Sequence, residues 1–515
     1  MTISKNYGTA VKFLLLALLF ATGVSAATPQ TIDNSALLPP IRPDSEVKLE
    51  YSPGKAIGHP DWLKSLILVE LNIETASSNR KFSGMAKTLD HLAETGVNGV
   101  WITPLHAGGH YGNHGIHTIN KRLTGPGSDE ECWNRVRQFV DECHKRNIRV
   151  FLDVISWGVR EDAPLRREKP EWFTGEFKKE WDGWLFDWSN PELNEWFIRN
   201  LVQCILRTGA DGFRCDCGPN FCKYEPYREA RTRLLKLGRK MIFFSEHASC
   251  RRDTFDFDQN AFIPGPARNR TKMMDCDSLL VNNIVDLVRS GAQLGAVDDY
   301  SKPGGTERFY AMMLSNHDSK GYSSQGDIIA FAYQAILSPF LPIWFLGEEW
   351  NNPYPYRRVP RRWLYDRKID TGARRENREF FETVKRMIRI RRLYPEIFEY
   401  FPDDHRKSNI AKVKVLSPWF RNRPEQLCQP YARYRGDSAV LVIPNNSPID
   451  GNYTVTIPYE LLKFSPGERF AVTDLLTGNV LATGTAEELN KFDLFVREGR
   501  LGVCLVAPAA RPLRR

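Results

Sequence analysis

Eight apolar runs with the length and composition of β-strands alternate with amphipathic, helix-like runs between residues 66 and 346. This alternation is typical of parallel βα units, because a parallel neighbour is reached only through a crossover connection. We therefore expect a (β/α)8 TIM barrel, with an open doubly wound sheet as the alternative. The expected strands are residues 66–73, 99–104, 149–155, a run ending at 216, a run ending at 246, 255–258, 309–315 and 341–346.

Three of these strand-like runs end at or just before an acidic residue. They read DGFRCD for residues 211–216, IFFSEH for 242–247 and MLSNHD for 313–318. An acid at the end of a buried strand is costly unless it is paired or used, and these strand ends carry the chemistry of (β/α)8 barrels. Asp216, Glu246 and Asp318 therefore predict a site with a nucleophile, a proton donor and a stabilising charge, which an open sheet would not need.

Side chains alternate between the two faces of a strand, which orients the residues around Asp216. Arg214 should point into the barrel with Asp216, where its fixed charge should keep the acid ionised. Cys215 and Cys217 should point outward and serve as small packing residues. The chain has ten cysteines, and their pairing cannot be deduced from the sequence.

The three acidic segments, in this order, resemble glycoside hydrolase family 13, the α-amylase family. Further similar segments are FLDV at 151–154, FDWSNPE at 186–192, FLGEE at 345–349 and YP at 394–395. The resemblance runs from about residue 62 to the C-terminus. It implies an enzyme that hydrolyses α-glucosidic bonds in α-1,4-glucans or malto-oligosaccharides with retention, through a covalent glycosyl-enzyme.

The resemblance also implies residue roles. Asp216 is expected to be the nucleophile, Glu246 the general acid/base, and Asp318 the third carboxylate, which favours the distorted sugar. A retaining enzyme needs one ionised and one protonated carboxyl about 5–5.5 Å apart, so the pKa of Glu246 should be raised. The expected substrate-binding residues are Arg214, His317, His114, Asp153 and Trp157.

Several positions depart from the family pattern. The usual Asn-His after the third strand is Trp157-Gly158, and an aromatic residue of the second-strand loop is Ile116. Pro219-Asn220 replaces a Lys-His pair after the nucleophile. These changes put the family calcium site in doubt, and we expect no metal or cofactor. Trp157, His110 or His117 would then take over sugar contacts.

These departures leave three functional hypotheses open. The same double displacement serves hydrolysis and transglycosylation, which differ in whether water or a sugar is the acceptor. A non-catalytic carbohydrate-binding protein is the alternative from another class. The presence of Asp216, Glu246, Asp318 and Arg214 favours an active enzyme, because an idle protein has no reason to keep three desolvated acids.

The N-terminus indicates export. Lys5 and Lys12 precede or begin an apolar run that ends near a Val24-Ser25-Ala26 cleavage site, which is typical of a signal peptide and too short to span a bilayer. We expect a secreted or periplasmic protein without a membrane anchor, acting as a monomer on an α-glucan or oligosaccharide. The formal charge of +9 comes from scattered residues, which disfavours nucleic acid as a partner.

The expected domain organisation follows from changes in pattern along the chain. Residues 1–26 are the expected signal peptide, 27–60 an extension, and 61–396 the barrel. A Trp-rich stretch, 157–190, interrupts the alternation after the third strand and should form a short excursion. Short strands and turns from 397 to 515 predict a C-terminal β-sandwich domain.

Overall fold

The structure is a computed structural model. It describes residues 31–49, 59–109, 111–216, 224–246, 254–259, 283–290, 311–314, 316–317, 328–350, 378–399, 409–416 and 428–514. The chain divides into two compact units, Met1–Ile32 and Asp33–Arg515, and every element below lies in the second. The expected signal peptide lies outside the described residues.

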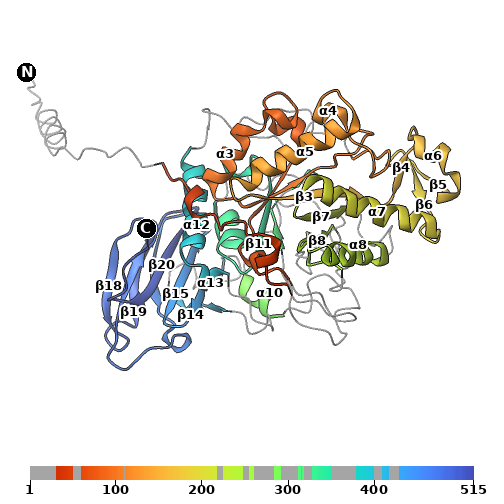
Figure 1. Cartoon of the computed structure of the whole chain (residues 1–515). Coiled ribbons are helices and arrows are strands. Elements are labelled where there is room, and N and C mark those ends of the chain that lie inside the picture. Colours follow the sequence, from red (N-terminus) through yellow and green to blue (C-terminus); the bar gives the residue numbers. More distant parts are fainter. Residues whose placement is uncertain are drawn as a thin grey trace, which may run out of the picture. The chain divides into compact units, whose positions relative to one another are not determined.

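A parallel sheet of eight strands forms the first part of the second unit (Figure 1). Its ladder runs in the order β10-β11-β1-β2-β3-β7-β8-β9, so that the chain order is kept around the sheet. The strands are β1 (Leu68–Leu71), β2 (Gly99–Ile102), β3 (Arg149–Ile155), β7 (Gly212–Asp216), β8 (Ile242–Ser245), β9 (Phe257–Asp258), β10 (Ala311–Met313) and β11 (Leu341–Phe345). The (β/α)8 fold class is confirmed, because all of these pairings are parallel and in barrel order.

Helices connect these strands. They include α3 (Ala86–Thr95), α5 (Asp129–His144), α7 (Pro191–Thr208), α8 (Tyr224–Lys236), α10 (Ile284–Ser290), the π-helical η10 (Ala330–Ile336) and α12 (Arg378–Leu393). Their ends follow local chemistry. A capping box of Ser128 and Glu131 starts α5, and Asn190 caps the first turn of α7, which ends at the left-handed Gly209 with φ 75°.

Short turns and helices complete the barrel part of the unit. They are η1 (Ser35–Leu37), η2 (Asp44–Glu46), η3 (Asp61–Ser65), α2 (Ile73–Ala76), η4 (Phe82–Gly84), α4 (Lys121–Thr124), η11 (Glu348–Trp350) and α13 (Pro395–Phe398). Among the described residues, no helix is long and apolar enough to cross a membrane.

The barrel has an inner and an outer apolar layer, as alternation along the strands requires. Trp101, Phe151 and Phe244 belong to a fully buried cluster inside the barrel. Cys215 belongs instead to the layer between strands and helices, while Arg214 lies in contact with inward-facing acids. The predicted orientations of Arg214, Asp216 and Cys215 are therefore confirmed. Cys217 lies outside the described residues.

An excursion of three antiparallel strands follows β3. Its elements are β4 (Gly158–Arg160), α6 (Pro164–Glu168), η5 (Pro170–Trp172), β5 (Phe173–Lys178) and β6 (Gly183–Phe186), with the strand order β4-β6-β5. A Cβ at Gly183 would lie 2.5 Å from the ring of Trp157, so this glycine lets the hairpin close over the tryptophan. The excursion falls within the predicted stretch 157–190.

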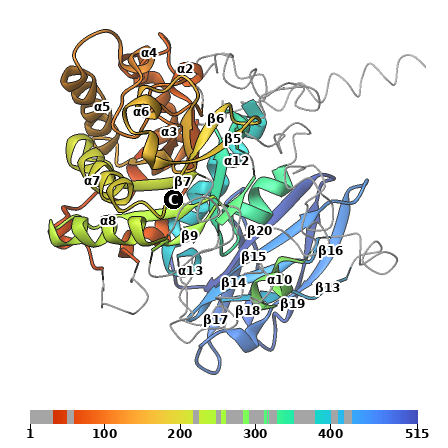
Figure 2. The same cartoon turned by 90° about the vertical axis from the view of Figure 1, so that its right-hand side faces the viewer.

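The C-terminal region is entirely β apart from the short η15 (Tyr459–Leu461) among its described residues (Figure 2). Its strands are β12 (Ile410–Lys412), β13 (Val415–Leu416), β14 (Tyr431–Arg435), β15 (Ser438–Asn445), β16 (Gly451–Thr456), β17 (Arg469–Asp474), β18 (Val480–Thr485), β19 (Lys491–Val496) and β20 (Arg500–Pro508). They form a six-stranded sheet, β12-β14-β15-β20-β17-β18, and a three-stranded sheet, β13-β16-β19. The two sheets share one apolar core, as predicted for a C-terminal all-β region. The exact domain boundaries stay predictions.

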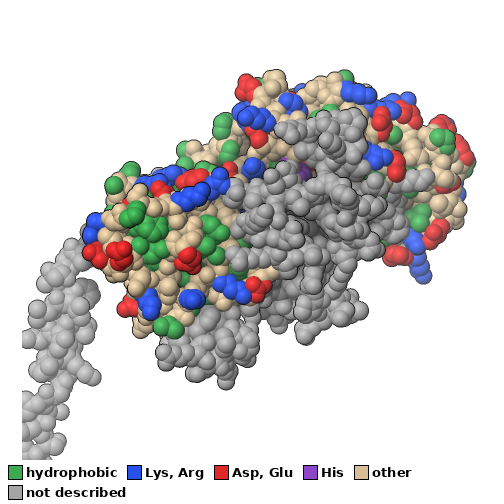
Figure 3. All heavy atoms as spheres, turned by 90° about the horizontal axis from the view of Figure 1, so that it is seen from below, with side chains coloured by type: hydrophobic (Ala, Val, Ile, Leu, Met, Phe, Trp, Pro, Cys, Tyr) green, Lys and Arg blue, Asp and Glu red, His purple; other side chains and the backbone are tan. Residues whose placement is uncertain are grey.

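The described cysteines are buried and form no disulfide. They are Cys132, Cys143, Cys204, Cys215, Cys428 and Cys504. Cys132 and Cys143 both lie in α5 and do not pair with each other. On the face seen in Figure 3, acidic and basic side chains are interspersed over the described surface.

Candidate active site

A single buried arginine gathers acids from three neighbouring strands. Arg214 of β7 is fully buried, and its Nη1 lies 3.1 and 3.2 Å from the two carboxylate oxygens of Asp153 on β3. The same nitrogen donates to Asp216 at the end of β7, and Nη2 lies 3.1 Å from Glu246, which follows β8. The predicted nucleophile and the predicted acid/base therefore share one guanidinium.

Asp153 is the anchor of this arrangement. Its side chain is completely buried, and it accepts hydrogen bonds from Trp101 Nε1 at 2.9 Å and Tyr111 Oη at 2.7 Å. The guanidinium of Arg214 also lies over the Trp101 ring, 4.8 Å from its centroid. With every oxygen of Asp153 occupied, this carboxylate is suited to hold Arg214 in place rather than to react.

Asp216 is in a different electrostatic position from the one predicted. Burial, together with the carboxylates of Glu246 and Asp153, raises the pKa of Asp216 to about 8, although Arg214 acts to lower it. The predicted effect of Arg214 is present, but burial outweighs it, because one cation serves three carboxylates. This raised pKa allows the Asp216–Glu246 pair to hold one proton between them at neutral pH, as a pair of one ionised and one protonated carboxyl requires.

His317 and Glu70 lie at the other side of this cluster. The His317 ring Nδ1 lies 2.5 Å from Glu70 Oε1, and its backbone N–H donates to Glu70 Oε2 at 3.1 Å. The Tyr111 ring stacks on the His317 ring with centroids 4.1 Å apart. Tyr111 thus joins His317 to Asp153, since its hydroxyl also donates to that acid.

Sequence analysis did not identify two residues of this site, Glu70 and Tyr111. Glu70 is an acid in the middle of an otherwise apolar strand, the same signal that singled out the three predicted acids. Tyr111 carries a weaker signal, because it lies in a loop and its φ of 47° is a left-handed conformation that a sequence does not announce.

Only some of the predicted substrate-binding residues lie together in the structure. Arg214, Asp153 and His317 come together, as described above. His114 lies against the excursion instead, where its Nε2 is 3.0 Å from Asp162. Trp157 is buried in an apolar cluster with Ile155 and Leu185, against which Tyr111 and Trp181 also pack, and its ring centroid is 5.3 Å from that of Trp181.

Some predictions cannot be placed. Asp318, His110 and Pro219-Asn220 lie outside the described residues. Within the described part of the chain, no group of three or more His, Cys, Asp or Glu side chains could hold a metal ion.

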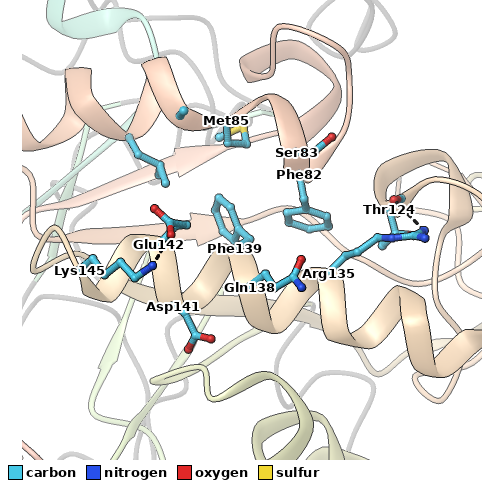
Figure 4. Close-up of a pocket in the computed structure, with 12 residues that line it drawn as sticks. Phe82, Ser83, Met85, Thr124, Arg135, Gln138, Phe139, Asp141, Glu142 and Lys145 are labelled. Atoms are coloured by element: carbon cyan, nitrogen blue, oxygen red, sulfur yellow. Dashed lines mark hydrogen bonds and ion pairs between the residues drawn. The ribbon is translucent and has the colours of Figure 1, made fainter.

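A separate cavity of about 440 Å³ lies on the outside of the barrel between η4, α3 and α5 (Figure 4). Its wall includes the facing rings of Phe82 and Phe139, 5.0 Å apart. Arg135 lines one end and donates to the backbone of Thr124 and Pro126. This cavity is built from helices and holds none of the strand-end acids, so the Arg214 cluster remains the candidate active site.

Known proteins that are similar to this chain include a trehalohydrolase and α-amylases. The malto-oligosyltrehalose trehalohydrolase of Saccharolobus solfataricus is 23% identical over 344 residues, which cover 57% of this chain and 58% of that protein. Among solved structures, maltogenic α-amylase AmyB from Thermotoga neapolitana superposes with a TM-score of 0.65 at 18% identity, covering 86% of this chain and 99% of that one. No protein-family model matches the chain.

The resemblance to the α-amylase family is confirmed. A second member, the Geobacillus thermoleovorans α-amylase solved with acarbose, has a TM-score of 0.61 at 14% identity and covers 87% of this chain. Identities this low establish a shared fold. The chain spans 58% of the length of the trehalohydrolase that it matches.

Proposed function

We propose that the chain is a retaining glycoside hydrolase of α-glucosidic bonds. One observation carries the proposal: Asp216 and Glu246, at the ends of adjacent strands, contact the two terminal nitrogens of one buried guanidinium. This shared contact supports the shorter separation of about 5–5.5 Å that retaining glycosidases use. The α-glucan substrate class rests on the names of the relatives, which include trehalohydrolase and maltogenic amylase.

The two carboxyls take complementary roles in the proposed reaction. Glu246, protonated, gives its proton to the leaving glycosidic oxygen while Asp216 attacks the anomeric carbon and forms a glycosyl ester. Glu246, now ionised, removes a proton from water, which displaces Asp216 and restores both groups. Arg214 bonds directly to Asp216 and lowers its pKa, so the shared proton is directed to Glu246 when a substrate displaces water.

The residues around the acids fit a sugar. The Tyr111 ring supplies an aromatic face beside Asp153 and Arg214, and such faces pack well against the C–H side of a pyranose. The imidazole ring of His317, which stacks on the Tyr111 ring, can form hydrogen bonds with sugar hydroxyls. We propose Asp318 as the third carboxylate because it follows His317 in the chain. α-1,4-Linked glucans are the proposed preferred substrates, and transfer to a sugar acceptor is the alternative outcome of the same intermediate.

The proposal extends to where the protein acts and to its oligomeric state. We propose that the protein is exported through residues 1–26 and acts outside the cytoplasm as a monomer. The support is the signal-like N-terminus alone.

The test is reducing-sugar release from a panel of α-glucans and maltosides by wild type, Asp216→Asn and Glu246→Gln. We expect release by the wild type and a loss of at least about a thousandfold in either variant. Glu171→Gln, which changes an exposed carboxylate of the excursion, is the matched control and should keep full activity. A 5-fluoro glycosyl fluoride should label the wild type at Asp216. No release and no labelling by folded protein would refute the proposal in favour of carbohydrate binding.

A further inference from the structure

Glu70 is a buried acid whose visible partner is a predicted substrate-binding residue. Its side chain, in the middle of β1, is fully buried. Both carboxylate oxygens are directed at His317: Oε1 lies 2.5 Å from the ring Nδ1, and Oε2 accepts the backbone N–H at 3.1 Å. Two contacts to one residue fix both the backbone and the ring of His317 against the barrel wall.

The surroundings of His317 Nδ1 show that this nitrogen carries a proton. Besides Glu70, the Tyr111 hydroxyl oxygen lies 3.1 Å away, and that hydroxyl donates its own proton to Asp153 at 2.7 Å. The ring nitrogen therefore lies between a carboxylate and a phenol oxygen that both act as acceptors. A bare nitrogen there would face two lone pairs in a buried site, which is strongly unfavourable.

Charge balance decides the state of the second ring nitrogen. Among the described residues, the titratable groups that act on the Glu70–His317 pair include Tyr111 from the loop after β2, Asp153 from β3 and Arg214 from β7. Arg214 lowers the pKa of Glu70 without contacting it, but its contacts are taken up by three other carboxylates. A fully buried carboxylate needs a cation of its own, and the imidazolium of His317 is the group in contact with it.

We propose that Glu70 is a positioning residue that keeps both ring nitrogens of His317 protonated, so that His317 is the second cation of the site and a fixed hydrogen-bond donor. The donor role toward sugar hydroxyls rests on the proposed function, whereas the protonation state does not.

The protonation state can be measured without any substrate. Nitrogen-15 spectra of histidine-labelled protein separate imidazolium from the two neutral tautomers, and His317→Asn assigns the signals. We expect wild-type His317 to remain imidazolium at about pH 7.5, and its titration midpoint to fall by about one to three pH units in Glu70→Gln. Glu349→Gln is the matched control, because Glu349 forms a second buried pair, 2.7 Å from His91 Nε2.

The control variant should leave the His317 titration midpoint unchanged. Neutral His317 in the wild type at neutral pH would overturn the proposal, as would an unchanged His317 midpoint in folded Glu70→Gln. The wild-type spectrum decides the first point even if Glu70→Gln does not fold.

A kinetic test connects the pair to catalysis. In Glu70→Gln we expect kcat/KM at about pH 7.5 to fall at least about tenfold, with the alkaline limb of the pH profile moved down by the same interval as the His317 midpoint. A purely structural role would lower activity equally at every pH. If the wild type hydrolyses no α-glucoside, the proposed function fails, while the nitrogen-15 titration still tests the Glu70–His317 pair.

Discussion

Replacing the proposed nucleophile should stabilise the protein while it abolishes activity. In Asp216→Asn the amide oxygen can still accept from Arg214, but the buried carboxylate and its desolvation cost are gone. Burial raises the pKa of Asp216 to about 8 in the folded protein, whereas an unfolded aspartate titrates near about 3.9. The folded wild type therefore binds more protons than the unfolded chain between these two values.

The sign of the pH dependence follows from this difference. Where the folded state binds more protons, the free energy of unfolding falls as pH rises. The contribution of Asp216 is complete below about pH 4 and is lost as pH rises toward about 8. Each pH unit corresponds to about 1.4 kcal/mol, so three units between about pH 5 and pH 8 give an upper limit of about 4 kcal/mol. We expect Asp216→Asn to gain up to this amount over the wild type across that interval.

Urea denaturation of both proteins at about pH 5 and pH 8 measures the effect, because a change in midpoint at constant slope reports stability. The Glu171→Gln variant supplies the baseline for a carboxylate at an exposed position. A difference between Asp216→Asn and wild type that stays constant with pH would refute the reasoning. A variant less stable than the wild type at pH 8 would mean that the ionised carboxylate is fully compensated by Arg214.

Three further outcomes are expected. Trp181→Ala should raise KM several-fold for long maltodextrins but not for maltotriosides, measured by initial rates, because Trp181 packs on Trp157 at the rim of the cluster that includes Tyr111. Burial lowers the pKa of His144, but the Asp211 carboxylate more than offsets this and raises it overall; His144→Asn should therefore cost stability near pH 6 and less near pH 9, measured by thermal unfolding. Gly183→Ala should lower the free energy of unfolding by about 1–3 kcal/mol, because its Cβ would lie 2.5 Å from the Trp157 ring; unchanged stability would show that this ring can move.

Much of the fold could be predicted from local pattern. Period-two alternation placed β3 at its observed bounds, Arg149–Ile155, and oriented Arg214 and Asp216 inward. Amphipathic periodicity over residues 192–208 and 375–393 indicates two helices, and α7 and α12 lie within a few residues of these bounds. These properties depend on the direction of successive side chains, which a sequence carries directly. The apolar run at residues 328–337 indicates a helix, and the structure has the π-helical η10 there, since hydrophobic periodicity cannot distinguish the two helix geometries.

Only part of the candidate site could be predicted from local sequence pattern. The acids Asp216 and Glu246 were recognisable because each ends a buried strand, but their common contact with Arg214 required adjacent strands in register. Trp157, expected to contact substrate, proved to be packed beneath the excursion hairpin. Its burial depends on Gly183, which is distant in sequence.

The sequence by itself determined the barrel, the strand ends that carry acids and the side of each strand that they face. Only the tertiary structure decided which charges share a buried space. Glu70 and His317 are 247 residues apart, and they meet because β1 and β10 are both neighbours of β11. The pKa of Asp216 depends in the same way on burial and on acids from β3 and β8. Desolvation and Coulomb interactions act through space, so they appear only when the chain has folded.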